Sequence, residues 1–513
     1  MHRFLIVLLV VAVACALSAP AGLAADEDVI VVFEQHAPQG ENVGDVDVAA
    51  MRISSSGKLV WAEGQRAVDI SSAEALESNP RAIPDGVGGA IIVFEVEART
   101  GENVGDTEIA AQRIDAKGNL MWNEGAKSVL VAASKWAETN PAIVSDGQGG
   151  AIVFFEEHAR DEKHAGDIDI GAQRISASGG ILWGGGERSA EAAATDQLER
   201  CPAAIPDGAG GAIVVFEMEA RTGENAGDTE IYAQRLDAQG NRLWNNGEKP
   251  VMVASSTWAE ANPVLVSDGQ GGAIVIFEQR GRSVERSGDI DIAAQRLSPS
   301  GQLMWKDGES SVSIADAEDI EQAPSVIPDG LGGAIVIFEV EPRTGEHAGD
   351  TEIAGQRLSG NGELEWEGGS GYTLIAFSEW AEKKPIAVPD GQGGAIAVFE
   401  QHARGGEHAG DIDVGAQRAS ATGELLWGNE GESSVDVSSS VRLERTIAAL
   451  PSGSGGVLVA FEMESRTGDS IGDADIGGQL ISSAGNALWN EGGESVLLTF
   501  SKWSEKKPVL VGR

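Results

Sequence analysis

The chain of 513 residues has few cysteines and few cationic side chains. It contains 37 Lys and Arg residues against 80 Asp and Glu residues, which gives a formal net charge of −43. Such an excess of negative charge disfavours nucleic acid and anionic membrane surfaces as partners, because both are themselves negatively charged. Hydrophobic residues make up 42% of the chain, which is enough to build a packed core, so the composition excludes a disordered chain.

Long apolar runs are also lacking, apart from one at the N-terminus. The run from Phe4 to Leu17 follows Arg3 and precedes small residues and an acidic segment, which is typical of an export signal. We place cleavage after Ala24, so residues 1–24 are predicted to be a signal peptide. The rest of the protein is expected outside the cytoplasm, in the periplasm or beyond the cell. No later stretch is apolar enough to span a bilayer.

Only two cysteines are present, Cys15 within the predicted signal and Cys201. Once the signal is removed, no intrachain disulfide can form, although an exported protein would be permitted one. Cys15 follows Ala-Val-Ala, which faintly resembles a lipoprotein processing site, so lipid anchoring at Cys15 is the alternative to simple export. Cys201 precedes Pro202 and is interpreted as a tolerated small residue rather than a nucleophile.

Helical periodicity is absent, and four landmarks recur about every 61 residues instead. They are a Trp after a Gly-containing turn, a Phe-Glu pair that ends an apolar run, an Asp-Gly-x-Gly-Gly turn, and a Gly-Asp-x-Asp/Glu-Ile run that leads into Ala-Gln-Arg. The first landmark stands at Trp61, Trp122, Trp183, Trp244, Trp305, Trp366, Trp427 and Trp489. We interpret these eight Trp residues as packing between neighbouring repeats.

One repeat contains four predicted strands. Pro141–Ser145 is the first, Asp146–Gly150 is a hairpin turn, and Ala151–Glu156 is a second strand that is apolar on both faces. Ile168–Ile175 is the third strand, and the last lies around Trp183, with a later apolar stretch that extends it or forms a short edge strand. Four antiparallel strands repeated eight times predict an all-β fold, a single eight-bladed β-propeller with WD40-like architecture but without the WD motif.

The two ends of the chain predict that the ring closes. Pro508-Val509-Leu510-Val511 repeats the first strand of a unit, and the segment after the predicted signal continues with the second. The C-terminal strand is therefore expected to join the three N-terminal strands, which would remove an exposed edge. The predicted domain is 25–513, with blade 1 formed by 508–513 and 25–79. Blades 2–8 start near 80, 141, 202, 263, 324, 385 and 446. A single extra residue is predicted between Thr446 and Pro451, as a bulge.

These units resemble those of bacterial secreted β-propeller-repeat proteins, whose repeats run Asp-Gly-x-Gly-Gly, then Asp-Ile-x-Ala-Gln-Arg, then Gly-x-x-x-Trp. The resemblance covers the whole chain after the signal and implies the propeller architecture. It implies no particular activity, because most members of the group have no assigned function. The Gly-x-Leu-x-Trp ending also resembles quinoprotein dehydrogenases, but the adjacent cysteines typical of their cofactor site are missing here.

A second period of 122 residues is superimposed on the first, so pairs of blades repeat. Blades 2, 4, 6 and 8 carry an Arg-Thr-Gly loop, and a second Trp set precedes the first strand of blades 3, 5, 7 and 1. These candidate ligand-binding residues are Arg99, Arg221, Arg343, Arg466, Trp136, Trp258, Trp380 and Trp503. Four exposed Trp side chains would suit stacking on sugar rings, whereas four buried ones would indicate inter-blade packing.

Three acidic residues per blade are expected at one rim, because the end of the second strand and the start of the third meet there. Oxygen-rich clusters of this kind can hold Ca²⁺, although no other cofactor is required. The alternative is a network of ion pairs with the loop arginines. The candidate metal ligands are Glu156, Asp167, Asp169, Glu217, Asp228, Glu230, Glu278, Asp289 and Asp291.

No Ser-His-Asp set, phosphate-binding Gly loop or zinc spacing is present. The blades are near copies, whereas an active site usually needs one blade to differ, so no catalytic residue is predicted. The sequence favours a monomeric binding or interaction scaffold, with a protein or glycan ligand outside the cytoplasm. The alternative is a carbohydrate-active enzyme or lectin that uses the rim carboxylates and the fourfold Trp ring.

Overall fold

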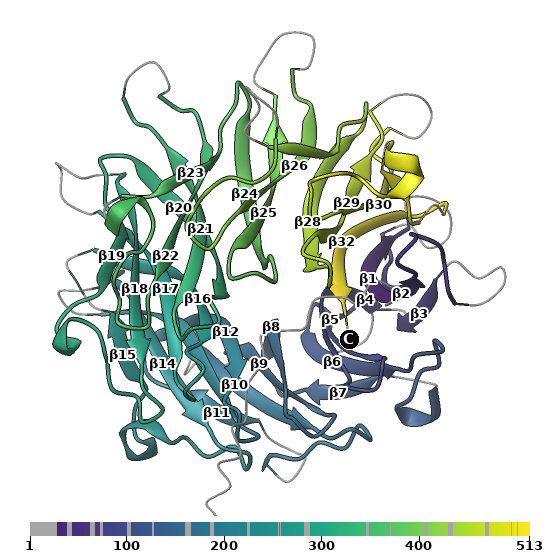
Figure 1. Cartoon of the computed structure of the whole chain (residues 1–513). Helices are drawn as coiled ribbons and strands as arrows, with labels where there is room; N and C mark the ends of the chain where they lie inside the picture. The colour runs from purple at the N-terminus through teal and green to yellow at the C-terminus, as the bar shows by residue number, and fades with distance from the viewer. Residues whose placement is uncertain are drawn as a thin grey trace, which may run out of the picture.

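The computed structural model (Figure 1) describes residues 28–512 with gaps. The gaps are 38–43, 62–66, 72–74, 100–103, 126–127, 160–165, 185–188, 223–225, 282–287, 345–347, 404–408, 429–433 and 467–470, together with residues 255, 257, 370, 494 and 500. The predicted signal peptide and Cys15 lie outside the described residues.

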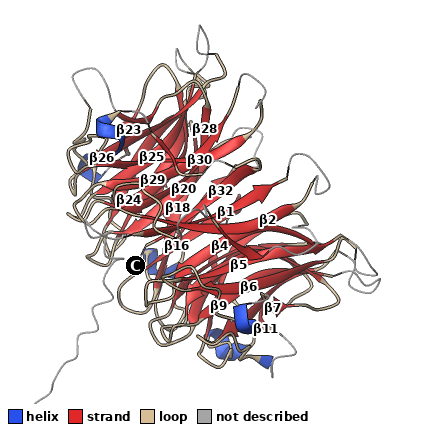
Figure 2. Cartoon of the chain, turned by 90° about the vertical axis from the view of Figure 1, so that its right-hand side faces the viewer, coloured by secondary structure: helices blue, strands red, loops and turns tan. Residues whose placement is uncertain are grey.

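The described residues form 32 strands, which dominate the regular structure (Figure 2). They fall into eight units of four, numbered here as the predicted blades: unit 1 contains β32, β1, β2 and β3, and each later unit takes the next four strands. The first strands are β4 (Ala75–Pro84), β8 (Ala137–Ser145), β12 (Leu198–Pro206), β16 (Ala259–Ser267), β20 (Ile320–Pro328), β24 (Ala381–Pro389), β28 (Leu443–Pro451) and β32 (Ser504–Val511). The second strands are β1 (Val29–His36), β5 (Ala90–Ala98), β9 (Ala151–His158), β13 (Ala212–Glu219), β17 (Ala273–Arg280), β21 (Ala334–Glu341), β25 (Ala395–His402) and β29 (Val457–Glu464).

The third strands are β2 (Val46–Ile53), β6 (Thr107–Ile114), β10 (Ile168–Ile175), β14 (Thr229–Leu236), β18 (Ile290–Leu297), β22 (Glu352–Leu358), β26 (Ile412–Ala419) and β30 (Ala474–Ile481). The fourth strands are β3 (Val68–Ser71), β7 (Val129–Ala132), β11 (Ala190–Ala193), β15 (Val251–Ala254), β19 (Val312–Ala315), β23 (Thr373–Ala376), β27 (Val435–Ser438) and β31 (Val496–Leu497). Short 3-10 turns lie at Asn123–Gly125, Trp244–Gly247, Lys306–Gly308, Glu367–Gly369 and Trp489–Gly492.

Within each unit the strands pair antiparallel in the order first, second, third, fourth. The C-terminal strand β32 pairs antiparallel with β1, with Val511 opposite Ile30, so the two ends of the chain share one sheet. Each first strand contacts the first strand of the next unit, from β4 through β28 to β32, and β32 contacts β4. Figure 1 shows the units set around a common centre, with the yellow β32 beside the purple β1.

The hydrophobic core lies between units rather than within one. Each cluster of buried side chains draws on two neighbouring units, and one cluster joins Phe33 of unit 1 to Trp489 of unit 8. The indole N–H of every landmark Trp donates to a backbone carbonyl of the next unit at 2.7–3.1 Å, and Trp489 donates to Ser55 of unit 1. Gly57 lies so close to the Trp489 ring that a Cβ there would be 2.9 Å from it. The predicted packing of these Trp residues between repeats is therefore confirmed.

The Asp-Gly-x-Gly-Gly turn and the Ala-Gln-Arg run are joined by hydrogen bonds between the Asp and the Arg. Asp85 Oδ1 accepts the backbone N–H groups of Val87 and Gly89, and Oδ2 accepts two N–H groups of Arg113 at 2.9 and 3.0 Å. Arg113 also donates to the carbonyl of Ala177 in the next unit. The same Asp–Arg pair recurs at Asp146–Arg174, Asp207–Arg235, Asp268–Arg296, Asp329–Arg357 and Asp390–Arg418. These motifs close a hairpin and tie two units together.

Two predicted strand positions are wrong. The first strand of unit 3 begins at Ala137 rather than at Pro141, because Pro141 follows a bulge at Asn140, whose φ is 53°. The stretch around Trp183 forms an isolated bridge between Ile175 and Ile181 instead of the fourth strand. The fourth strand is Ala190–Ala193, so the later stretch forms the short edge strand that was predicted as one of its two possibilities.

The position predicted for the extra residue is also wrong. Thr446 is the bulge residue of unit 8, with φ 53°, and it lies 62 positions after its equivalent Lys384. Gly415 already pairs with Asp436, whereas the equivalent Gly171 pairs with Glu191, a separation of 21 against 20. The insertion therefore precedes the fourth strand of unit 7, instead of lying between Thr446 and Pro451.

Candidate functional site

The Phe-Glu glutamates, which include the candidate metal ligands Glu156, Glu217 and Glu278, connect neighbouring units. Glu156 Oε1 accepts the backbone N–H of Cys201, the bulge residue of the next unit, at 2.8 Å. The corresponding bond, at 2.7–2.9 Å, forms for Glu34, Glu95, Glu217, Glu278, Glu339, Glu400 and Glu462. Burial acts to raise the pKa of Glu156, but hydrogen bonds from His158, Asn140 and Cys201 outweigh it and lower the pKa. This glutamate ring serves inter-unit hydrogen bonding.

Cys201 takes part in this inter-unit bonding through its backbone N–H, and its thiol is not arranged as a nucleophile. It occupies the left-handed bulge position, with φ 55°. The residue is exposed, but desolvation by the surrounding atoms, together with the carboxylates of Glu217 and Glu156, raises the pKa of its thiol to about 11. A thiol with such a pKa is protonated at neutral pH and therefore unreactive.

The four candidate arginines reach the rim aspartates of the preceding unit. Arg221 donates to Asp167 at 3.2 Å, and Arg343 approaches Asp289 at 3.8 Å. The equivalent pairs are Arg99–Asp45 and Arg466–Asp411, at 3.1 and 3.0 Å. Ion pairing, the alternative reading of the acidic rim, thus accounts for these four arginines.

A fourth acidic set, which the sequence analysis missed, lies in the first strands. Its members, here called the buried glutamates, are fully inaccessible to solvent: Glu77, Glu138, Glu199, Glu260, Glu321, Glu382, Glu444 and Glu505. Their common signal in the sequence is a Glu two residues before the bulge position. They are buried because the first strand lies innermost in its unit, against the next first strand.

In unit 3, acidic side chains line up across neighbouring strands. Glu138 of β8 lies opposite Glu157 of β9, and Glu157 lies opposite Asp169 of β10. Parallel pairing of Ile168 with Leu198 then brings Asp169 beside Glu199 of unit 4. Burial and, after it, repulsion between carboxylates raise the pKa of Glu138 and Asp169 to about 7 and that of Glu199 to about 8.

The four Trp residues of the second set are half-buried. Trp136 follows a turn in which its backbone N–H donates to the Ser134 hydroxyl at 2.9 Å, and Trp258, Trp380 and Trp503 repeat this bond. The Lys135 ammonium lies 5.6 Å from the centre of the Trp136 ring. The same turn hydrogen bond thus forms at all four positions, and each Trp residue is partly exposed.

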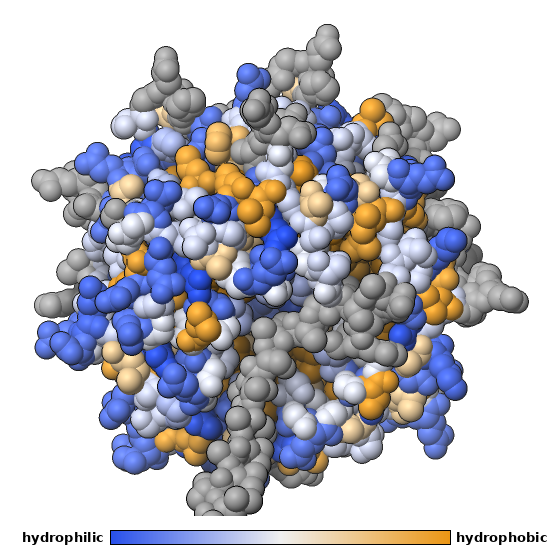
Figure 3. All heavy atoms as spheres, viewed as in Figure 1, coloured by the Kyte–Doolittle hydropathy of each residue, from blue (hydrophilic) through white to orange (hydrophobic). Residues whose placement is uncertain are grey.

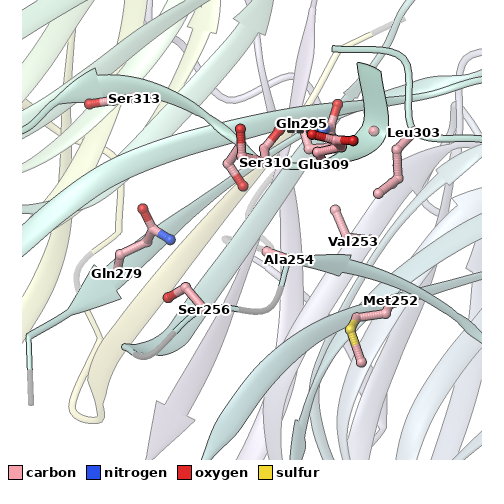
Figure 4. A pocket seen from close by; sticks show the side chains of 12 residues that line it. Met252, Val253, Ala254, Ser256, Gln279, Gln295, Leu303, Glu309, Ser310 and Ser313 are labelled. Carbon is pink, nitrogen blue, oxygen red and sulfur yellow. Dashed lines mark hydrogen bonds between the residues drawn. The ribbon is translucent and has the colours of Figure 1, made fainter. Parts of the chain in front are cut away.

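A cavity of about 410 Å³ opens beside Trp136, between units 2 and 3. Its floor carries Glu138, Glu157 and Asp169, and Leu130 of the outer strand β7 forms an apolar edge. A second cavity of about 310 Å³ lies 122 residues further on, with Met252 at the place of Leu130 and Gln279 at the place of Glu157. Figure 4 shows the second cavity, in which Ser256 and Gln279 lie apart from Gln295, Glu309 and Ser310. Repetition at the blade-pair period indicates a built feature of the fold.

Odd and even units differ in one side chain of the second strand, at the position of Glu157. Odd units carry a polar side chain at the position of Glu157, namely Gln35, Gln279 and Gln401. Even units carry Val96, Met218, Val340 and Met463 there. At the position of Glu157, the side chain is therefore polar in odd units and apolar in even units. Glu157 is the single acid among the eight equivalent positions.

Within the described ranges, no group of three or more His, Cys, Asp or Glu side chains is arranged to hold a metal ion. The candidate ligands of even units, Asp228 and Glu230, lie at the start of β14, and Asp289 and Asp291 lie at the start of β18. No helix in the described part of the chain is long and apolar enough to span a membrane.

No protein-family model matches the chain, and no curated protein matches it. Among solved structures, it is similar to an ulvan lyase of a new polysaccharide lyase family, at 12% identity over 80% of this chain and 94% of that one, with a TM-score of 0.44. It is also similar to the β-propeller domain of the Trilobed protease from Pyrococcus furiosus, at 10% identity over 83% and 96%, with a TM-score of 0.42. A levansucrase of Bacillus subtilis shares 12% identity over 57% and 85%, with a TM-score of 0.31. All three TM-scores lie below 0.5, so these likenesses carry no argument about activity.

Proposed function

We propose that this chain is an exported, monomeric, closed eight-bladed β-propeller that binds a glycan without transforming it. Closure is supported by the pairing of β32 with β1, by the cycle of first-strand contacts and by the hydrogen bond from Trp489 to Ser55. On the face that Figure 3 shows, apolar patches are separated by hydrophilic side chains, which is in keeping with a monomer.

The single observation that carries the binding function is the cavity beside the half-buried Trp136. A second cavity, lined by Met252 and Gln279, lies at the corresponding place one blade pair further on. Volumes of about 300–1,000 Å³ are usual for small-molecule sites. The cavity beside Trp136 combines an aromatic face, an aliphatic edge from Leu130 and several polar side chains. Aromatic faces stack on the apolar side of sugar rings while polar side chains bond to hydroxyl groups.

A glycan panel tests this function through intrinsic Trp fluorescence and calorimetry on residues 25–513. A ligand that binds the wild type should lose about tenfold in affinity in Trp136→Ala, if stacking contributes about 1.4 kcal/mol. The variant lacking Trp136, Trp258, Trp380 and Trp503 should not bind. Gln197→Ala, at the equivalent turn position of an even unit, is the matched control and should bind as the wild type does. Undiminished binding by the fourfold variant would refute the proposal.

A carbohydrate-active enzyme is the second candidate, favoured by one observation. Burial raises the pKa of Glu138 to about 7, and Glu157 lies directly opposite on the neighbouring strand of the same cavity. A general acid near pH 7 paired with a second carboxylate is the arrangement glycosidases use. Release of reducing ends from a polysaccharide, lost in Glu138→Gln, would establish the enzyme and exclude the non-catalytic reading.

Calcium binding at the rim is a separate proposal. It concerns the predicted rim ligands Asp167 and Asp169 rather than Glu156, whose Oε1 already accepts two N–H groups. A chelator should lower the melting temperature by several degrees if Ca²⁺ holds these carboxylates together. An identical melting curve with and without chelator would dismiss calcium.

A further inference from the structure

The two cavities share a position, and Glu260 and Asp291 of unit 5 correspond to Glu138 and Asp169 of unit 3, but the cavity walls differ in charge at two other positions. The unit 3 cavity is lined by Glu138, Glu157, Asp169 and Glu191, with Lys135 as the cationic side chain among its lining residues. At the equivalent positions in the unit 5 cavity, Gln279 replaces Glu157 and Ser313 replaces Glu191, and Glu309 is the acid in its lining. Since shape and backbone are repeated, the difference points to different ligand groups at the two places.

Two oxygens of the unit 3 cavity lack a hydrogen-bond donor among the described residues, and the first of them has an equivalent in Glu260 Oε2 of unit 5. Glu138 is fully buried, and while its Oε1 accepts the backbone N–H of Ser134 at 3.0 Å, its Oε2 accepts none. Asp169 is 8% exposed, and its Oδ1 likewise accepts none. A buried carboxylate oxygen without a donor is costly, because it has given up its bonds to water. Both oxygens would be satisfied by a ligand that brings N–H groups.

The aromatic wall of this cavity already associates with an ammonium group. The Lys135 Nζ lies 5.6 Å from the Trp136 ring centre, within the range of a cation–π interaction. On the opposite side, the Ser189 hydroxyl donates to Glu157 Oε1, which fixes that carboxylate at the cavity wall. A cationic group in the cavity would therefore meet carboxylates on the strands and an aromatic ring beside them.

We propose that the cavity between units 2 and 3 binds the protonated primary amine of an amino sugar, with its N–H groups directed to Glu138 and Asp169 and its ring beside Trp136. This assignment rests on the glycan-binding function proposed above and names the ligand class for one of its grooves. Glu157, unique among the second-strand positions, supplies the additional negative charge that selects the amine.

The test compares the glucosamine dimer with its di-N-acetyl form, by calorimetry on residues 25–513 at 0.15 M salt. The two sugars share a ring and a linkage, but only the first carries ammonium groups. We expect the free amine form to bind at least tenfold more tightly. Glu157→Gln, which installs the residue of units 1, 5 and 7, should remove most of that preference.

Two controls separate the site from general attraction to an acidic protein. Glu424→Gln removes an equal charge from an exposed turn and should retain the preference. Gln279→Glu should strengthen amine binding in unit 5. Equal affinities for the two dimers, or a preference that survives in a folded Glu157→Gln protein, would overturn the assignment. In that case binding of other glycans through Trp136 would still uphold the proposed function, whereas a protein that binds no glycan would refute both.

Discussion

At the scale of single residues, the buried glutamates differ from unit to unit in the hydroxyl group that donates to their carboxylates. Hydroxyl groups donate to several of them, as Thr195 does to Glu199 and Ser501 does to Glu505, four positions later in each case. In unit 6 the equivalent donor position holds Ala317. Among the described residues no hydroxyl group donates to Glu321, and the backbone N–H of Ala317 is the donor beside its carboxylate. Burial and the charges of Asp291, Asp319 and Asp289 raise the pKa of Glu321 to about 8.

Ala317→Ser should therefore stabilise the protein by about 1 kcal/mol, because a hydroxyl would supply the missing donor. Urea unfolding measures the difference. Ala484→Ser, in an exposed turn, should leave stability unchanged. An Ala317→Ser protein no more stable than the wild type would show that Glu321 is satisfied in another way.

At the scale of strands and turns, each landmark has a single role at the boundary between units. The Trp after the turn bonds to the next unit, the Phe-Glu glutamate caps the next bulge, and the Arg of Ala-Gln-Arg reaches the carbonyl of the next turn. Two of these bonds also span the boundary between unit 8 and unit 1, where Trp489 donates to Ser55 and the backbone N–H of Lys507 donates to Glu462. The third is missing there because Leu480 stands at the place of the Arg. Each boundary is therefore held by hydrogen bonds as well as by the shared hydrophobic core.

Trp489→Phe tests whether the boundary between the chain ends is as strong as an internal one. It removes the bond to Ser55 as Trp244→Phe removes the bond to Pro299. In a closed ring both variants should lose about 1–3 kcal/mol, since each loses a buried hydrogen bond and indole volume. If Trp489→Phe were as stable as the wild type while Trp244→Phe were destabilised, the two chain ends would not be held together in solution.

At the scale of the whole molecule, acidity and stability are linked through the buried carboxylates. Burial raises the pKa of Glu138, Glu260, Glu382 and Glu505 to about 7, and that of Glu199 and Glu321 to about 8. Between the ordinary pKa near 4.5 and these values, the folded protein holds protons that the unfolded chain has released. Stability contributed by the protonated form is thus present below about pH 4.5 and lost as the pH rises through 7–8.

The melting temperature should accordingly fall as the pH rises from about 5 to 8.5. Glutamates with a lowered pKa, such as Glu34 and Glu400, work in the opposite direction but mainly near pH 4, below this window. Scanning calorimetry across the range measures the slope. Replacing Glu260 and Glu382 by Gln should flatten it, and a melting temperature that rises steadily toward pH 8.5 would contradict the assignment.

Much of the architecture was predictable because the same sequence landmarks recur at a fixed spacing. The spacing of the landmark Trp residues predicted units and strands, and Pro508–Val511 predicted a strand that matches the first of a unit; both follow from local patterns repeated in register. The bulge at Asn140 and the true position of the insertion were missed, since backbone conformation and strand register depend on pairing with β9 and β26.

The candidate site was predicted less well. Trp136 was singled out from its period, but Glu138 was overlooked because a lone Glu before an Asn-Pro step reads as a surface residue. Likewise, the sequence by itself determined the pairwise alternation and the excess of acid, since both are properties of residue order. Only the tertiary structure decided which acids bond to arginine, which cap a bulge and which are buried beside a cavity. That division depends on contacts between units, which bring together residues some 45 to 65 positions apart.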